Sequence, residues 1–248
     1  MHSKHLLGVL GGLGPMASAY FYEMITEHTD AACDQEHIDI ILSSRASTPD
    51  RTDYILGRSA DSPLPAMIED ARSLEAFGAR AIVIPCNTAH YFIDQVRASV
   101  SVPVPSIIRE TAHFVRRIGR RRAAILATEG TIHAEAYQSA LRAEGVEWRV
   151  PDPDVQRLLM RIIYDYVKRG VRADPALLYE AARPMVEAGC DCMILGCTEL
   201  SVAARETNGD PLFVDSLEVL ACRAILMCER KTKGFRAEFA QMDPEIQI

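Results

Sequence analysis

The sequence contains no apolar run long enough to cross a membrane. The first apolar stretch, Leu6–Leu10, is too short for the core of a signal peptide and is typical of a strand. Positive charge is also scarce: 27 Lys and Arg stand against 34 Asp and Glu, a balance that disfavours a nucleic-acid partner. Seven cysteines, an odd number without a secretion signal, indicate reduced thiols. We therefore expect a cytoplasmic protein that binds neither a membrane nor nucleic acid.

A chain of 248 residues with 48% hydrophobic residues can bury a sizeable core in one large domain or two small ones. Apolar runs alternate with amphipathic helical stretches, which predicts an α/β fold with parallel sheets covered by helices. We expect strands at Leu6–Leu10, Ile38–Ser43, Ala81–Ile84, Val104–Ile107, Ala123–Ala127, Met193–Leu195 and Leu212–Val214. We expect helices near Met16–Thr29, Pro65–Phe77, Asn87–Ser99, Ile108–Arg117, His133–Glu144, Asp154–Arg169, Pro175–Glu187 and Ser216–Arg230.

The two halves of the chain repeat one pattern. Cys86 lies eight residues after Gly78, and Cys197 lies eight residues after Gly189, with a short apolar run between each pair. We infer an internal repeat of one α/β unit, which predicts two similar domains related by pseudo-two-fold symmetry. The first covers residues 1–112 and the second 113–211. The strand and helix of 212–231 are expected to return to the first domain, and 232–248 to form a loosely held tail.

Each of these cysteines stands where a buried strand gives way to a polar loop. A single strand-end cysteine is more often a small buried hydrophobic residue than a reactive group. The matched pair favours chemistry instead, because two related halves that face each other bring two thiols to opposite sides of one cleft. That arrangement suits the removal of a proton from one face of a carbon and its return to the other face. A helix that starts after Cys86 would favour its thiolate.

The segment Gly11–Ala17 follows a strand and opens a helix, with Pro15 suited to the first helical turn. Three interpretations are open: a tight turn, a loop whose N–H groups bind a carboxylate, and a dinucleotide site. The last lacks its acidic residue, because the second strand ends at Ser43 and is followed by Ser44 and Arg45.

Two further clusters favour a structural role. Cys190 and Cys192 precede Cys197, but they are predicted to point to one face of a strand without a fourth ligand, so no metal site is expected. Cys33, Cys222 and Cys228 are interpreted in the same way. The basic run Arg116–Arg122 is explained by a solvated helix end.

Six segments together resemble the cofactor-independent aspartate/glutamate racemase superfamily, and its aspartate racemases above all. They are Gly11–Ala17, Asp34–His37, Pro49–Thr52, Pro85–His90, Ala127–Thr131 and Gly196–Glu199. The resemblance implies two similar α/β domains with the active site in the cleft between them, commonly in a homodimer. It also implies that neither pyridoxal phosphate nor a metal takes part, so no cofactor is expected.

The resemblance carries site residues over to this chain. It implies that Cys86 and Cys197 are the catalytic pair, and that Arg51 and Lys168 are the cations for the carboxylates of the substrate. Asn87, Thr88 and Thr198 match positions that hold its α-carboxylate and amino group. The expected substrate-binding set is completed by Gly12, Met16, Thr128, Thr131 and Glu199.

The function implied is a two-base racemisation of a free acidic amino acid, aspartate first. Glu199 stands where glutamate racemases usually carry histidine, which favours the aspartate branch, whereas Glu129 adds a carboxylate that would repel an acidic substrate. Glutamate, a broader substrate range, or a decarboxylase or isomerase with one thiol are alternatives within the superfamily. Outside it, a nucleotide-binding protein and a redox dithiol protein remain open.

Overall fold

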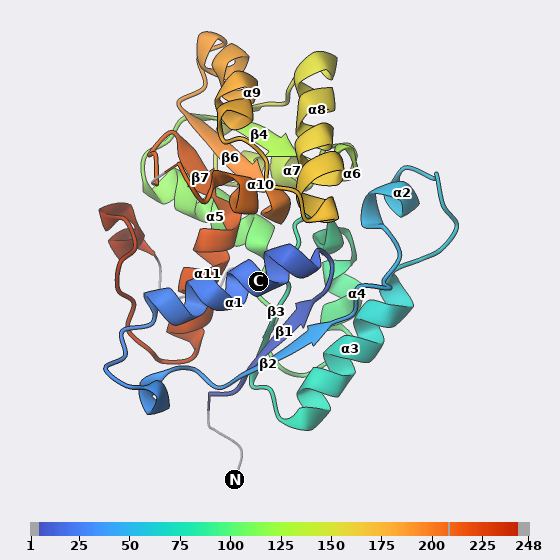
Figure 1. The fold of residues 1–248 in the computed structure, drawn as a ribbon, viewed down its shortest axis with the longest axis vertical. Coiled ribbons are helices and arrows are strands. Elements are labelled where there is room, and N and C mark those ends of the chain that lie inside the picture. The colour runs from blue at the N-terminus through green and yellow to red at the C-terminus, as the bar shows by residue number, and fades with distance from the viewer. Residues whose placement is uncertain (1–4, 208, 243–248) are drawn as a thin grey trace.

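The computed structural model describes residues 5–207 and 209–242, and within them the strands form two parallel sheets (Figure 1). The strands of the first sheet, in spatial order, are β2 (Ile40–Ser44), β1 (Leu7–Gly11) and β3 (Ala81–Val83). Those of the second are β5 (Glu147–Arg149), β4 (Arg122–Ala127), β6 (Cys192–Gly196) and β7 (Phe213–Asp215). All the pairings between these strands are parallel. The predicted α/β class is therefore confirmed.

Helices connect the strands throughout. Those of the first half are α1 (Pro15–His28), α2 (Arg51–Ile55), α3 (Leu64–Phe77), α4 (Ile93–Arg97) and α5 (Ile107–Arg117). Those of the second are α6 (Glu129–His133), α7 (Ala136–Ala143), α8 (Pro153–Met160), α9 (Ala176–Glu187), α10 (Thr198–Ala204) and α11 (Ser216–Met227). Shorter turns are the 3-10 segments Asp34–Glu36, Thr88–Phe92, Val167–Arg169 and Ala237–Gln241 and the π-helical segment Arg161–Tyr166.

The central strands are apolar because both of their faces are covered. All residues of β1 and β6 are buried, as expected for strands inside a parallel sheet with helices on both sides. Alternate side chains enter different clusters: Ala123 and Ile125 pack in a core shared by both halves, and Ala124 in a core of the second half only. Cys192 belongs to the shared core and Cys190 to the other, so the prediction that they share one face was wrong.

The last strand does not return to the first half. β7 pairs with β6 in the second sheet, which corrects the predicted return of residues 212–214 to the first domain. Helix α11 packs mainly against α5 and α1 of the first half, and it also contacts α10 and β6 of the second half, so it lies between the halves (Figure 1). The domain boundaries themselves stay a prediction.

One predicted strand does not form, and one observed strand was not predicted, each for a physical reason. The segment 104–107 forms no strand, because Pro103 and Pro105 lack the N–H groups that a ladder needs. Its neighbour Pro103 still accepts one bond from the N–H of Ile82, at 3.0 Å. The edge strand β5 was missed because its three residues are partly polar and largely exposed.

The segment after residue 231 is packed against the first half as far as residue 242, so the prediction of a loose tail was wrong there. Thr232 forms an antiparallel bridge with Thr29, and the N–H of Lys233 donates to the carbonyl of His28 at 2.9 Å. The ring of Phe239 is buried and lies 4.5 Å from that of Phe114, centroid to centroid. Residues 243–248 of the predicted tail lie outside the described residues.

Among the described residues, the helices include none that is both long and apolar enough to cross a membrane.

A buried ion pair joins α11 to α5. The Arg223 guanidinium lies 2.9 Å from the Glu110 carboxylate, and each side chain is 1% exposed. We expect Arg223→Met alone to lower the free energy of unfolding by about 3–5 kcal/mol, because it leaves a buried carboxylate without its main cation. Urea denaturation measures this. The double variant Glu110→Leu/Arg223→Met should recover most of the loss; a double variant as unstable as the single one would contradict the explanation.

Candidate active site

A small buried pocket lies where the carboxyl ends of strands from both sheets meet. The first half contributes Leu13, Asp50, Arg51, Thr52, Cys86, Asn87 and Thr88. The second contributes Thr128, Tyr164, Lys168, Cys197, Thr198 and Glu199. The free volume is about 10 Å³, close to the minimum for one water molecule. The side chains therefore nearly fill the pocket, and both predicted cysteines line it.

Cys86 follows β3, and its carbonyl is hydrogen-bonded to a buried histidine, His90. The ring Nδ1 of His90 lies 2.8 Å from the Cys86 carbonyl, and the N–H of Ile107 donates to His90 Nε2 at 3.1 Å. These contacts require a proton on Nδ1 and a lone pair on Nε2, hence a neutral ring. Burial lowers the pKa of His90 to about 4, which agrees with that form. His90 thus ties the Cys86 loop to the start of α5.

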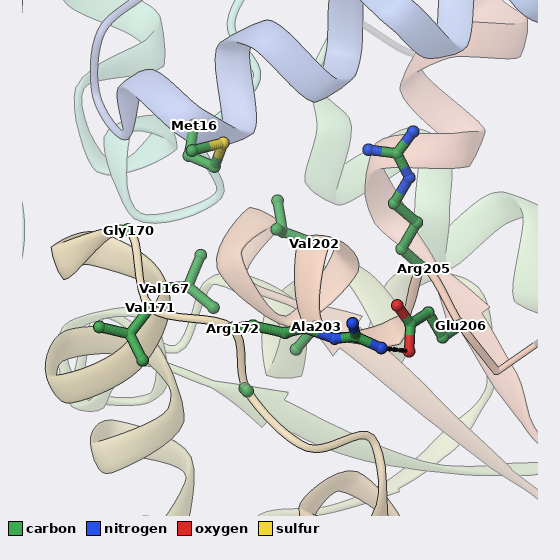
Figure 2. A pocket seen from close by; sticks show the side chains of 10 residues that line it. Met16, Val167, Gly170, Val171, Arg172, Val202, Ala203, Arg205 and Glu206 are labelled. Carbon is green, nitrogen blue, oxygen red and sulfur yellow. Dashed lines mark hydrogen bonds and ion pairs between the residues drawn. The ribbon is translucent and has the colours of Figure 1, made fainter.

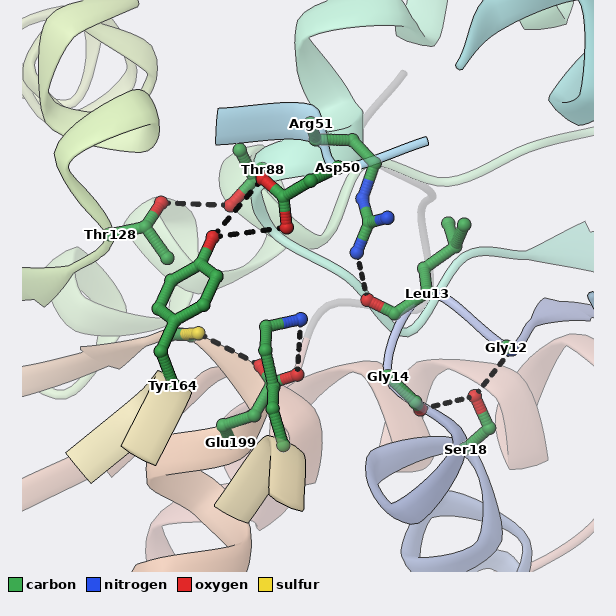
Figure 3. A network of polar contacts seen from close by, with 12 residues as sticks. Gly12, Leu13, Gly14, Ser18, Asp50, Arg51, Thr88, Thr128, Tyr164 and Glu199 are labelled. Carbon is green, nitrogen blue, oxygen red and sulfur yellow. Dashed lines mark hydrogen bonds and ion pairs between the residues drawn. The ribbon is translucent and has the colours of Figure 1, made fainter. Parts of the chain in front are cut away.

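Cys197 follows β6 and shares one carboxylate with a lysine. The Cys197 thiol donates to Glu199 Oε2 at 3.0 Å, and Lys168 Nζ lies 3.1 Å from Glu199 Oε1 (Figure 3). Burial and then the Glu199 carboxylate raise the pKa of Cys197 well above its usual value, although Lys168 acts in the opposite direction. Burial opposes the charge of Lys168, but Glu199 and the two sulfurs outweigh it and raise the pKa of Lys168.

Arg51 lines the pocket on the side that the first half of the chain provides, and it is 6% exposed. Its guanidinium donates to the carbonyls of Leu13 and Pro49, the latter at 3.0 Å (Figure 3). Burial opposes its charge, but the Cys86 sulfur, Asp50 and Glu199 outweigh that effect and raise the pKa of Arg51. Its Nε–H has no acceptor among the described residues. The two predicted cations therefore line one pocket, and the Glu199 carboxylate and the Cys86 sulfur favour the charge of both.

The predicted polar residues fall into two groups. The hydroxyls of Thr88, Thr128 and Thr131 form a triangle with sides of 2.9, 2.9 and 3.0 Å that joins the two halves. Thr198 lines the pocket and is buried.

Asn87 is bonded to two protein side chains. Its Nδ2 donates to Ser216 Oγ at 3.0 Å, and its Oδ1 accepts from Tyr137 at 2.6 Å. These bonds fix its orientation beside Cys86.

The sequence analysis missed Tyr164 and the role of Asp50. The Tyr164 hydroxyl lies 3.2 and 3.1 Å from the two carboxylate oxygens of Asp50, across the pocket (Figure 3). Burial raises the pKa of Tyr164, so the phenol stays protonated and donates. A signal was available, because Tyr164 lies one helical turn before Lys168 and Asp50 directly precedes Arg51.

The glycine loop after β1 is a tight turn. Gly12 has φ 78°, and a Cβ there would lie 2.3 Å from the backbone nitrogen of Arg45. The N–H of Gly12 already donates to Ser18 Oγ at 2.9 Å (Figure 3). Of the three interpretations of this loop, these contacts favour the tight turn. The proposed contact of Gly12 with substrate stays untested.

Met16 and Glu129 lie outside the buried pocket. Met16 is half exposed and lines a second, more apolar cavity of about 230 Å³ between the start of α1, residues 167–173 and the end of α10 (Figure 2). Glu129 pairs with Arg58 at 2.7 Å, so its carboxylate is compensated outside the pocket. Its expected repulsion of an acidic substrate is thereby reduced.

The cysteines, histidines and carboxylates of residues 5–207 and 209–242 include no group of three or more that could hold a metal ion.

With this geometry in place, the chain can be compared with known proteins. Residues 10–224 match the family described as Asp/Glu/Hydantoin racemase. The chain belongs to this family. The resemblance inferred from the six segments is thereby confirmed, and so is the prediction of an amino-acid racemase.

Several racemases are similar over nearly their whole length. The aspartate racemase of Picrophilus torridus is 28% identical with a TM-score of 0.81, over 96% of this chain and 99% of that chain. An aspartate racemase homologue from Pyrococcus horikoshii OT3 is 25% identical with a TM-score of 0.72, over 91% and 99%. The broad specificity amino-acid racemase RacX of Bacillus subtilis (strain 168) is 26% identical over 220 residues, which are 87% of this chain and 95% of RacX.

The neutral, buried His90 predicts a pH-dependent stability. Its pKa is about 4 in the fold and about 6.5 when unfolded, so the unfolded chain binds the extra proton first as the pH falls. The contribution of His90 is complete above about pH 6.5 and declines toward pH 4, by up to about 1.4 kcal/mol per pH unit.

Urea denaturation of wild type and His90→Asn at several pH values measures this effect, because Asn does not titrate. We expect the difference in stability between the two proteins to shrink as the pH falls from 6.5 to 4. A constant difference would contradict the neutral buried ring.

Proposed function

We propose that this protein is a cofactor-independent racemase that interconverts L- and D-aspartate with Cys86 and Cys197 as its two bases. The observation that carries the proposal is that both thiols, one from each half, line the same small buried pocket. One sulfur, as thiolate, takes the Cα proton, and the other, as thiol, supplies a proton to the opposite face. Two thiolates in one pocket would repel each other, so a pair with one charge is the working state.

The difficult step is the formation of the carbanion at Cα, since its charge must be taken up by the α-carboxylate. The hydroxyls of Thr88 and Thr128 line the pocket and can turn from each other toward that carboxylate, and the Asn87 amide has a second N–H besides the one that it gives to Ser216. Arg51 is suited to a two-pronged grip on a carboxylate, and Lys168 acts as a point charge.

The small free volume of the pocket requires its walls to move when an amino acid enters. We propose that the two halves open for the substrate and close over it, which excludes water and strengthens these contacts.

Aspartate is proposed as the substrate because a buried arginine and a partly buried lysine line the pocket, and because an aspartate racemase and an aspartate racemase homologue are similar over nearly the whole chain. A second candidate is a broad specificity racemase. It is favoured by the carboxylates of Asp50 and Glu199, which line the same pocket and balance Arg51 and Lys168, and by the similarity to RacX. The homodimer implied by the resemblance and the cytoplasmic location expected from the cysteine content also remain proposals.

The two-base mechanism predicts distinct defects for the two cysteines. Cys86→Ala and Cys197→Ala should each lower the racemisation rate at least about 100-fold, because each removes one acid–base group. In deuterated water, each variant should exchange the Cα proton of one enantiomer only, and the two variants should differ in which. Chiral chromatography with mass spectrometry measures both effects.

Cys190→Ala is the matched control, since this buried cysteine lies outside the pocket. A Cys86 or Cys197 variant that racemises near the wild-type rate would point to a one-thiol enzyme instead.

The role of Arg51 predicts a change in substrate preference. Arg51→Ala should lower kcat/KM for aspartate about 10- to 100-fold more than for a monocarboxylic amino acid, because a charged hydrogen bond to the second carboxylate is lost. The measurement is kcat/KM for aspartate, glutamate, serine and alanine. Arg183→Ala, which removes an exposed arginine outside the pocket, is the control. An equal loss for all four substrates would contradict this role.

A further inference from the structure

The carboxylate of Glu199 has no task in the two-base scheme, although it lies between two of its groups. Glu199 is the second residue of α10 and is 4% exposed. One oxygen accepts the Cys197 thiol at 3.0 Å and the other faces Lys168 Nζ at 3.1 Å (Figure 3). A substrate carboxylate that approached Lys168 would compete with Glu199, which already forms an ion pair with this lysine.

The space for this carboxylate depends on a glycine. A Cβ built on Gly14 would lie 2.4 Å from Glu199 Oε1, so a side chain at that position would displace the carboxylate. The Glu199 carboxylate is thus bound by the Cys197 thiol and the Lys168 ammonium group, and it has room there because Gly14 carries no side chain.

The groups around the two sulfurs differ. Cys197 donates directly to the Glu199 carboxylate, whereas Cys86 lines the side of the pocket that the first half provides, together with Arg51. Every element packed around the pocket contributes to this field. The titratable and charged groups that face Cys197 and Glu199 are Lys168, Tyr164, Tyr137, Arg51, Asp50 and Cys86. Of the carboxylates among them, Glu199 is the one that accepts a bond from a site cysteine in the described part of the chain.

We propose that Glu199 is a positioning residue that keeps Cys197 protonated, so that the main form of the free enzyme has Cys86 as the base and Cys197 as the acid, and the reverse direction starts from the minor form in which these roles are exchanged. This inference rests on the proposed two-base function. The raised pKa of Cys197 agrees with it.

The proton balance of the cycle is then fixed. The Cys86 thiolate takes the Cα proton of one enantiomer and forms an S–H bond, and the bonding pair stays on Cα. The Cys197 S–H bond breaks and its proton forms the new Cα–H bond on the opposite face. The enzyme returns to its starting state when Cys86 releases its proton to water and Cys197 takes one from water. Repulsion between the Cys197 thiolate and Glu199 drives this return.

The test uses the free protein and needs no turnover. Iodoacetamide alkylates thiolates, so the alkylation rates of Cys86 and Cys197, followed by peptide mass spectrometry between pH 6 and 10, report their ionisation. Both sulfurs line one pocket, so the ratio of their rates cancels the frequency with which that pocket opens.

In wild type we expect Cys86 to react faster than Cys197 at neutral pH. In Glu199→Gln, which keeps the shape but loses the charge, the Cys197/Cys86 rate ratio should rise at least about 10-fold, equivalent to a shift of one pH unit. The alkaline limb of the kcat/KM profile should move to lower pH by the same amount.

Two further variants sharpen the test. Lys168→Met should change the ratio in the opposite direction, because it removes the cation that favours the Cys197 thiolate. Gly14→Ala should raise the ratio by displacing the carboxylate without removing it, and it replaces Glu199→Gln if that variant fails to fold.

An unchanged ratio in both Glu199→Gln and Gly14→Ala would overturn the inference, even if the protein racemises aspartate. A raised ratio in a protein that racemises no amino acid would uphold the control of Cys197 by Glu199 and overturn the proposed function.

Discussion

The site depends on the direction of the strands. In a parallel sheet the carboxyl ends of all strands lie on the same side, and in this protein those sides of the two sheets face the same pocket. The loops after β1, β2, β3, β4 and β6 therefore deliver their side chains to a single pocket, although residues such as Leu13 and Thr198 are far apart in sequence. Helix α11 contacts α1 and α5 of the first half and α10 and β6 of the second, and so joins the two halves. If one sheet were displaced, both the sulfur pair and the threonine triangle would be lost.

Burial strengthens the influence of each charge in the pocket on the pKa values of its neighbours. Because little water separates the groups, a single carboxylate changes the ionisation of a thiol and of an ammonium group at the same time. Arg51 and Lys168 bring two positive charges, and Asp50 and Glu199 bring two negative ones. A substrate must therefore compete with carboxylates of the protein for these cations. Its charge, rather than its size alone, is expected to decide how well it is used.

The fold could be predicted largely from the apolar runs. β1, β4 and β6 are buried on both faces, so their residues are almost all apolar and their positions are clear from the sequence. The predictions were wrong where a segment is buried without belonging to a sheet, or belongs to a sheet without being buried. Val104 is buried but has prolines on both sides, β5 is bonded but exposed, and Phe239 is buried in a segment of mostly polar residues. Periodicity reports burial, whereas a strand also needs a partner with free N–H and C=O groups.

The sequence by itself determined the class of fold, the racemase family and the matched positions of Cys86 and Cys197, because these depend on local patterns that repeat along the chain. Only the tertiary structure decided which groups touch. It joined Tyr164 to Asp50, Asn87 to Tyr137 and Ser216, and the Glu199 carboxylate to both Lys168 and Cys197. Except for the short step from Cys197 to Glu199, these contacts link residues from different elements. Their distances follow from how the two halves pack, which no local pattern records.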